Sequence, residues 1–154
     1  MKSMVNTLDM KLIDRLMRFA RSTWAELGGL VDLSAPAAAE RVHKLEERGI
    51  IKGYSAIIDP EAVGLGLAAL ISVCLERPEY RKNFLEKVNS LPEIRECHHV
   101  AGDEDYVIKV ICKDTRDLER LVSEEIKAVN GIMKTKTTII LSTVKDTPIL
   151  PINT

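Results

Sequence analysis

Three acidic residues stand next to one another in "HHVAGDEDYVIKV", the stretch from position 98 to 110. Asp103, Glu104 and Asp105 follow a glycine and precede a tyrosine. Carboxylates grouped in this way can accept the ammonium group of a small molecule, and the N–H groups of a turn beside a glycine can bind its carboxylate. Acids between two antiparallel strands are also commonly just solvated turn residues. The residues alone leave both interpretations open.

A cysteine and two histidines come directly before the acids, which raises the question of a metal site or a catalytic thiol–imidazole pair. Alternation along a strand places Cys97 and His99 on one face and His98 on the other, and no CxxC or second ligand pair completes a closed metal site. Neighbouring side chains on one face of a strand are about 7 Å apart, too far for a thiol–imidazole contact. The chain also has no glycine-rich phosphate loop with its lysine and no GxSxG. We expect no metal, no cofactor and no enzymatic activity.

Basic residues gather in a second stretch, "LSAPAAAERVHKLEERGIIKGY" at positions 33–54. Small residues at its start would let a helix N-terminus approach a DNA groove, where its N–H groups attract phosphate. The long cations Arg41, Lys44 and Arg48 would then reach the DNA backbone or base edges. Glutamates at positions 40, 46 and 47 dilute this charge. A three-helix bundle whose third helix happens to be charged fits the spacing equally well.

Periodicity and capping signals indicate three helices in the first part of the chain. "LDMKLIDRLMRFAR" repeats apolar residues at three- and four-residue spacing, which is typical of an amphipathic helix. Thr23 and Glu26 have the spacing of a capping box at the start of a second helix. Ser34 suits the N-cap of a third helix and Gly49 its C-terminal stop. A short β-rich stretch at 54–58 should follow.

Strand and helix signals alternate in the rest of the chain. Their order, βαββαβ, closes into a four-stranded antiparallel sheet with both helices on one face. In "DYVIKVICK" the apolar residues Tyr106, Ile108, Val110 and Cys112 share the face that should pack on the helices. The other face is left uncovered and is partly apolar, so we expect a second copy of the chain to pack on it.

Composition limits the class of protein without deciding it. The 154 residues are 45% hydrophobic and 29% charged, enough for a buried core in one or two domains. No apolar stretch reaches the roughly 18 residues of a membrane span, and three cysteines at unrelated spacings suit a reducing compartment. We therefore expect a cytoplasmic protein that does not enter a membrane. The net charge of -1 argues against indiscriminate binding of polyanions.

Three stretches in order resemble the leucine-responsive regulatory protein/AsnC family of prokaryotic transcription regulators. They are "LD…ID..L", "LS……RV..LE..GII.GY…D…LG" and "V.G..DY.I.V", and together they span nearly the whole chain. The resemblance implies an α+β protein with a winged helix-turn-helix domain at 1–53, a linker at 54–64, and a ferredoxin-like effector-binding and oligomerisation domain at 65–154. It also implies binding of double-stranded DNA, a homodimer that assembles to a tetramer or octamer, and a small effector such as an amino acid.

The resemblance also implies site residues, carried over by position. Those facing DNA would be Ser34, Pro36, Ala38, Arg41 and Lys44, and those lining the effector site would be Gly102, Asp103, Asp105 and Tyr106. Hydroxyl groups of the last strand, at Thr135, Thr137 or Thr138, are further candidates for effector contacts. An alternative function is an oligomeric small-molecule-binding module without specific DNA binding.

Two departures from the family pattern qualify these expectations. Gly28 and Gly29 stand where helix formers or a small–large pair are more usual, so the second helix should be short or held by packing. The alanine-rich start of the third helix offers few hydrogen-bonding groups for reading bases. We expect DNA shape and paired half-sites to supply much of the specificity.

Overall fold

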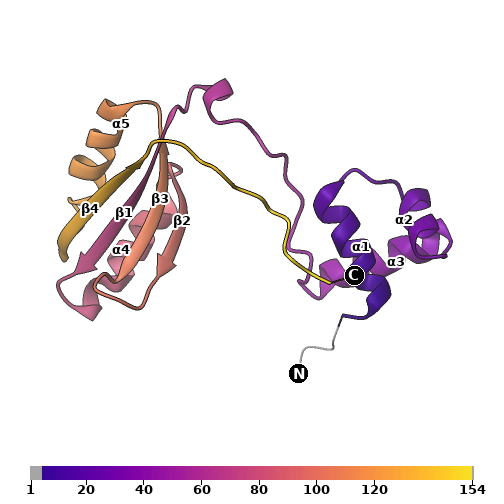
Figure 1. The fold of residues 1–154 in the computed structure, drawn as a ribbon. Coiled ribbons are helices and arrows are strands. Elements are labelled where there is room, and N and C mark those ends of the chain that lie inside the picture. Colours follow the sequence, from indigo (N-terminus) through magenta and orange to yellow (C-terminus); the bar gives the residue numbers. More distant parts are fainter. Residues whose placement is uncertain (1–4, 154) are drawn as a thin grey trace. The chain divides into compact units, whose positions relative to one another are not determined.

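The computed structural model describes residues 5–153, which fall into two compact units (Figure 1). The helical unit comprises Met1–Ile57 together with Lys145–Thr154, and the sheet unit comprises Ile58–Val144. The sequence places the whole segment 65–154 in one domain, whereas here the end of the chain clusters with the helices. One contact there is a hydrogen bond of 3.3 Å from the Leu150 backbone N–H to the Met17 sulfur. Within the described residues, no helix combines the length and the apolar character that crossing a membrane requires.

The helical unit contains the three helices that the sequence predicts (Figure 1): α1 Thr7–Arg18, α2 Trp24–Leu30 and α3 Ala35–Glu47. The predicted capping box is present at α2, where the Thr23 side chain and the Glu26 side chain each accept a backbone N–H of the other residue. The Ser34 hydroxyl accepts the Ala37 N–H at 3.2 Å and begins α3. Gly49 then ends α3 with a left-handed φ of 68°.

The turn between α2 and α3 depends on a close backbone approach. A Cβ at position 28 would lie 2.5 Å from the Leu33 carbonyl oxygen, so only glycine fits without a shift. The Leu33 N–H donates to the Gly28 carbonyl at 2.9 Å, and Asp32 takes a left-handed φ of 56°, which aspartate tolerates better than most residues. The second helix is therefore both short and held by packing, as its two glycines predict.

No wing is formed by the described residues of the helical unit, which is a correction to the expected winged domain. Residues 54–58 are exposed and form no strand. A strand needs a neighbour with which to exchange backbone hydrogen bonds, and no other described segment of this unit supplies one. Their β-branched composition is a local preference that this single chain leaves unsatisfied.

The sheet unit has the predicted βαββαβ order with strand order β2-β3-β1-β4. Its elements are β1 Leu67–Leu75, α4 Arg81–Ser90, β2 Ile94–His99, β3 Tyr106–Cys112, α5 Thr115–Arg120 and β4 Ile132–Ile140. All three strand pairs are antiparallel. The helix predicted after β3 is composite, because α5 continues as a π-helical turn, η3 Leu121–Ile126.

Both helices of this unit cover the same face of the sheet. The fully buried residues Ile71 and Ile108 are register partners in β1 and β3, and they share a core with Phe84 of α4 and Leu121 of η3. The alternate residues, such as Leu70 and its partner Lys109, are on the other face, which no described helix covers. This uncovered face is where the sequence predicts a second copy.

Candidate DNA-binding surface and effector loop

The predicted DNA-facing residues of α3 do not all point outward. Ser34 and Pro36 are exposed at the start of the helix, and the Lys44 side chain is 63% exposed. Ala38 is 0% exposed and packs into the core of the helical unit. Four-residue spacing from Ala38 continues to the buried Val42, so this side of the helix faces inward. Ala38 therefore cannot touch DNA in this structure.

Arg41 is engaged within the protein. Its Nε donates to Asp9 Oδ1 of α1 at 3.0 Å, and the two side chains are 30% and 11% exposed. Asp9 is itself part of the capping box that begins α1 with Asn6. Arg41 thus ties α3 to α1. Lys44 is different, because its partner at 2.8 Å is the exposed Glu40 one turn away on the same helix.

An aromatic and ionic cluster covers the exposed side of α3. The ring of Trp24, the first residue of α2, meets His43 edge-on with centroids 5.5 Å apart. His43 Nδ1 lies 3.3 Å from Glu46 Oε2, and the Tyr54 hydroxyl donates to the other oxygen of Glu46 at 2.8 Å. Burial and this hydrogen bond raise the pKa of Tyr54 to about 12. Hydrogen bonds from Tyr54 and His43 lower the pKa of Glu46.

The acidic loop between β2 and β3 is fastened to β1 by Asp105. Its carboxylate accepts the Leu75 N–H at 2.7 Å, and its backbone N–H donates to the Val73 carbonyl at 3.0 Å. Its carbonyl closes the loop by accepting the Val100 N–H at 3.0 Å. Gly102 takes a φ of 151°, which favours glycine. Asp105 therefore holds the loop in place with the carboxylate that was expected to meet an ammonium group.

A small cavity of about 60 Å³ lies between this loop and the uncovered face of the sheet. Its lining combines two acids of the loop with the polar ends of two strands: Ser72, Cys74, Asp103, Glu104, Lys134 and Lys136. The Cys74 thiol donates to the Asp103 carbonyl at 3.7 Å. Among residues 5–153, none forms an ion pair with either of these acids or either of these lysines. We call this cavity the loop pocket.

Three of the predicted effector residues lie elsewhere. Tyr106 is 3% exposed in the core, with its ring 4.9 Å from those of Phe84 and His99. Thr135 and Thr137 pair with Val73 and Ile71, whose side chains face the helices. They are therefore on the opposite side of β4 from Lys134 and Lys136. The structure brings together Gly102, Asp103 and the fastening residue Asp105, but not these three.

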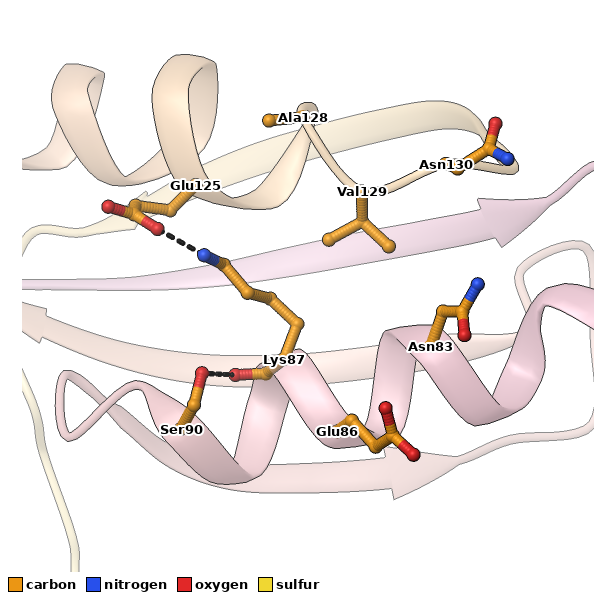
Figure 2. A pocket seen from close by; sticks show the side chains of 8 residues that line it. All are labelled: Asn83, Glu86, Lys87, Ser90, Glu125, Ala128, Val129 and Asn130. Atoms are coloured by element: carbon orange, nitrogen blue, oxygen red, sulfur yellow. Dashed lines mark hydrogen bonds and ion pairs between the residues drawn. The ribbon is translucent and has the colours of Figure 1, made fainter.

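A larger cavity of about 450 Å³ lies between α4 and the end of η3 with the residues that follow it (Figure 2). Its charged groups are already paired, because the Lys87 ammonium contacts the Glu125 carboxylate and the Ser90 hydroxyl donates to the Lys87 carbonyl at 2.7 Å. Glu86, which pairs with Lys82 at 4.0 Å, lines the rest together with Ala128, Val129 and the amides of Asn83 and Asn130. No predicted site residue contributes to it.

The residues of the CHH stretch are divided as strand alternation predicts. Cys97 and His99 pair with Ile108 and Tyr106 on the helix side, and His98 pairs with Val107 on the open face. His99 stacks on the Tyr106 ring, and His98 lies 3.0 Å from Glu96. Across the part of the chain that the structure describes, no three histidine, cysteine or acidic residues are grouped so that they could hold a metal ion.

Of the six residues that line the loop pocket, the predicted effector residues include only Asp103. The sequence did not point to Ser72, Cys74, Lys134 or Lys136 as site residues. The signal was present, because residues two apart share a face. What the sequence lacked was the register that sets Cys74 against Lys134 and Ser72 against Lys136.

Comparison with known families also divides the chain into two parts, except that residues 145–150 fall in the second match although the structure clusters them with the helices. Residues 6–46 match the AsnC-type helix-turn-helix domain, and residues 68–150 match the Lrp/AsnC ligand binding domain. The leucine-responsive regulatory protein of Haemophilus influenzae is 31% identical over 95% of this chain and 89% of its own length. That of Escherichia coli K12 is 32% identical over 97% of this chain and 93% of its own length.

Solved structures agree over the same span. A transcriptional regulator from Neisseria meningitidis in complex with L-Met superposes with a TM-score of 0.92 at 29% identity, covering 97% of this chain and 98% of that one. The feast or famine regulatory protein of Mycobacterium tuberculosis, complexed with L-methionine, gives 0.86 at 34% identity, with 93% and 96% covered. With both of its units matched in order and full-length relatives above 30% identity, this chain belongs to the Lrp/AsnC family of transcriptional regulators.

Proposed function

We propose that this protein is a cytoplasmic, sequence-specific DNA-binding regulator without enzymatic activity. It binds double-stranded DNA through α2 and α3 and responds to an amino acid held by its sheet unit. The observation that carries the DNA-binding part is the α2–α3 turn, in which Gly28, Asp32 and the Ser34 cap fix two helices at the spacing of a helix-turn-helix. The AsnC-type domain match covers the same residues.

The exposed start of α3 supplies the DNA-facing groups in this proposal. Ser34 and Pro36 permit a close approach of the helix N-terminus to the phosphate backbone, whose charge favours the N-terminal end of a helix. When DNA binds, Lys44 exchanges its exposed partner Glu40 for a phosphate. Breaking this pair loses little free energy, because exposed ion pairs contribute about 0–1 kcal/mol. Arg41 acts by positioning α3 through Asp9.

The effector part of the proposal rests on the loop pocket. An amino acid presents an ammonium and a carboxylate, and the loop pocket offers two acids and two lysines without partners in the described chain. Asp103 is the ammonium partner in this arrangement, and Asp105 positions the loop around it. Two structurally similar regulators were solved with L-methionine, which supports the ligand class.

Assembly is the third part of the proposal. The face of the sheet opposite α4 and α5 carries Leu70, Val107 and Ile111 among polar residues, and no described element of the chain covers it. A second copy packing on this face gives a homodimer, and further association gives a tetramer or octamer. Size-exclusion chromatography with light scattering measures the state directly, and a monomer at micromolar concentration would contradict it.

Gel shifts with DNA from upstream of the protein's own coding sequence test DNA binding. We expect a specific complex whose affinity falls steeply with salt, because phosphate contacts release counterions. A protein that binds amino acids but shifts no promoter fragment at low salt would instead be an oligomeric small-molecule-binding module. Adding amino acids to the same gel shifts tests whether ligand binding to the sheet unit changes the affinity for DNA.

A further inference from the structure

We propose that the effector of this protein is a small dicarboxylic amino acid, aspartate or glutamate, rather than an aliphatic one. The proposal rests on the proposed function, since it assigns a side-chain chemistry to the amino acid of the loop pocket. Three features carry it: the two lysines, the separation of the opposite charges, and the lack of an apolar wall.

The lysines form a pair of cations on one face of one strand. Lys134 and Lys136 are two residues apart in β4, so both side chains point to the uncovered face, at a spacing of about 7 Å. No carboxylate of the described chain pairs with them, although Lys87, Lys44 and Lys82 each have one. Two cations so placed repel each other until anions lie between them. A ligand with two carboxylates meets both lysines.

The acids approach the loop pocket from another element. Asp103 and Glu104 belong to the loop that Asp105 fastens to β1, whereas the lysines belong to β4, on the other edge of β1. The loop pocket thus has an anionic side and a cationic side. An α-ammonium group matches the first and carboxylates match the second. A dicarboxylic amino acid has this distribution of charge.

The residues at the base of the loop pocket favour polar ligands over aliphatic ones. Ser72 and Cys74 form this base, and the six lining residues include no aliphatic or aromatic side chain. Beyond the methylene stems of the two lysines, a leucine or methionine side chain would find no apolar surface among these residues, and its burial beside four charged groups would remove water from them. The Ser72 hydroxyl, by contrast, can donate to a carboxylate.

A matched ligand series on the full-length protein tests each charge by thermal shift and calorimetry. L-aspartate and L-glutamate should raise the melting temperature most, because a ligand that binds only the folded state stabilises it. L-asparagine, which lacks the second carboxylate, and succinate, which lacks the ammonium, should each bind at least tenfold more weakly. L-leucine and L-methionine complete the series as aliphatic competitors.

Two charge-removing variants test the location. Lys134→Met and Lys136→Met keep the aliphatic stem, and each should weaken L-aspartate binding by about tenfold or more. Lys82→Met removes the same charge from an exposed position of α4 and should leave the affinity unchanged. Both pocket lysines are exposed in the single chain, so these variants retain its fold, and light scattering shows whether the assembly is unchanged. Unchanged affinity in both pocket variants would overturn the assignment.

Alkylation of the three thiols locates the ligand independently. Burial raises the pKa of Cys97 and raises that of Cys112 to about 11, so these two should react slowly at neutral pH. Cys74 lies in the loop pocket, and bound L-aspartate should slow its alkylation, measured by peptide mass spectrometry, with no effect on the other two. Protection of Cys97 or Cys112 instead would place the ligand elsewhere.

The possible results distinguish a failure of the dicarboxylic assignment from a failure of the proposed amino-acid response. Tighter binding of leucine or methionine than of aspartate and glutamate overturns the dicarboxylic assignment and leaves an amino-acid-responsive regulator standing. If no amino acid shifts the melting temperature, changes the gel shift or protects Cys74, the effector part of the proposed function fails as well. Preferential binding of aspartate or glutamate, lost in the Lys134 and Lys136 variants, supports both.

Discussion

Helix α3 and the acidic loop are held in opposite ways. Around α3 the space is filled and the charged groups find partners: Gly28 abuts the turn, Arg41 meets Asp9, and Lys44 meets Glu40. Around the loop, one carboxylate, that of Asp105, does the fastening, and four other charged side chains converge on a cavity without pairing. Whether a charged side chain stabilises the fold or is available to a ligand therefore depends on its partners and not on its residue type.

The largest effect should come from filling the close approach in the α2–α3 turn. Gly28→Ala puts a Cβ against the Leu33 carbonyl and should lower the free energy of unfolding by about 2–3 kcal/mol through overpacking. Gly29→Ala is the matched control, since a Cβ there meets nothing within 4 Å, and it should stabilise by about 0.5 kcal/mol. Urea unfolding of both variants gives the comparison, and equal effects would contradict the role of the turn.

Breaking the Arg41–Asp9 pair should be next in size. Arg41→Met leaves the nearly buried Asp9 carboxylate without its partner, and we expect a loss of about 1–2 kcal/mol, reduced from a fully buried pair because Arg41 is partly solvated. Arg21→Met removes the same charge from an exposed loop residue as a control. A variant that loses DNA affinity with unchanged stability would instead make Arg41 a direct DNA contact.

Releasing the acidic loop should have a smaller effect. Asp105→Ala leaves the Leu75 N–H without an acceptor and should reduce stability by about 1 kcal/mol, with faster amide exchange at Leu75. Asp105→Asn keeps an oxygen that can accept this hydrogen bond and should retain most of the stability. If the two variants behave alike, the negative charge rather than the hydrogen bond holds the loop.

Removing an exposed charge from α3 should separate stability from DNA binding. Lys44→Met should change the free energy of unfolding by less than about 0.5 kcal/mol, because its pair with Glu40 is exposed. It should reduce the slope of log affinity against log salt by about 0.9, the value for one lost phosphate contact. Lys82→Met, on α4, is the control for nonspecific charge effects. An unchanged slope would remove Lys44 from the DNA surface.

The smallest effect concerns the hydrogen bond that the Tyr54 hydroxyl donates to Glu46 of α3. Because the pKa of Tyr54 is raised to about 12, its bond to Glu46 should contribute fully to stability below pH 10 and be lost as pH rises through about 12. The ultraviolet difference spectrum between the parent and Tyr54→Phe reports its ionisation. Glu46→Gln should lower the pKa of Tyr54, and a Tyr54 that titrates near 10 in the parent would show that the bond is absent in solution.

The sequence predicted the helices and the order of the strands because these depend on local signals. Capping residues Thr23, Ser34 and Gly49 act within one turn, and the alternation in β3 acts within one strand. The orientation of the predicted site residues could not be read from local signals. Ala38, Tyr106, Thr135 and Thr137 have suitable side chains or positions, but which way they face depends on packing with distant elements.

The sequence by itself determined the two-part α+β organisation, the family, and the loop at 102–105, because spacing, capping and hydrophobic period are written along the chain. Tertiary structure decided which charges are available. Arg41 donates to Asp9, 32 positions earlier in the chain. Asp105 accepts the N–H of Leu75, 30 positions earlier. The register of β1 with β4 brings Lys134 and Lys136 to the acids. Electrostatic partners are chosen by distance in space, which no local pattern encodes.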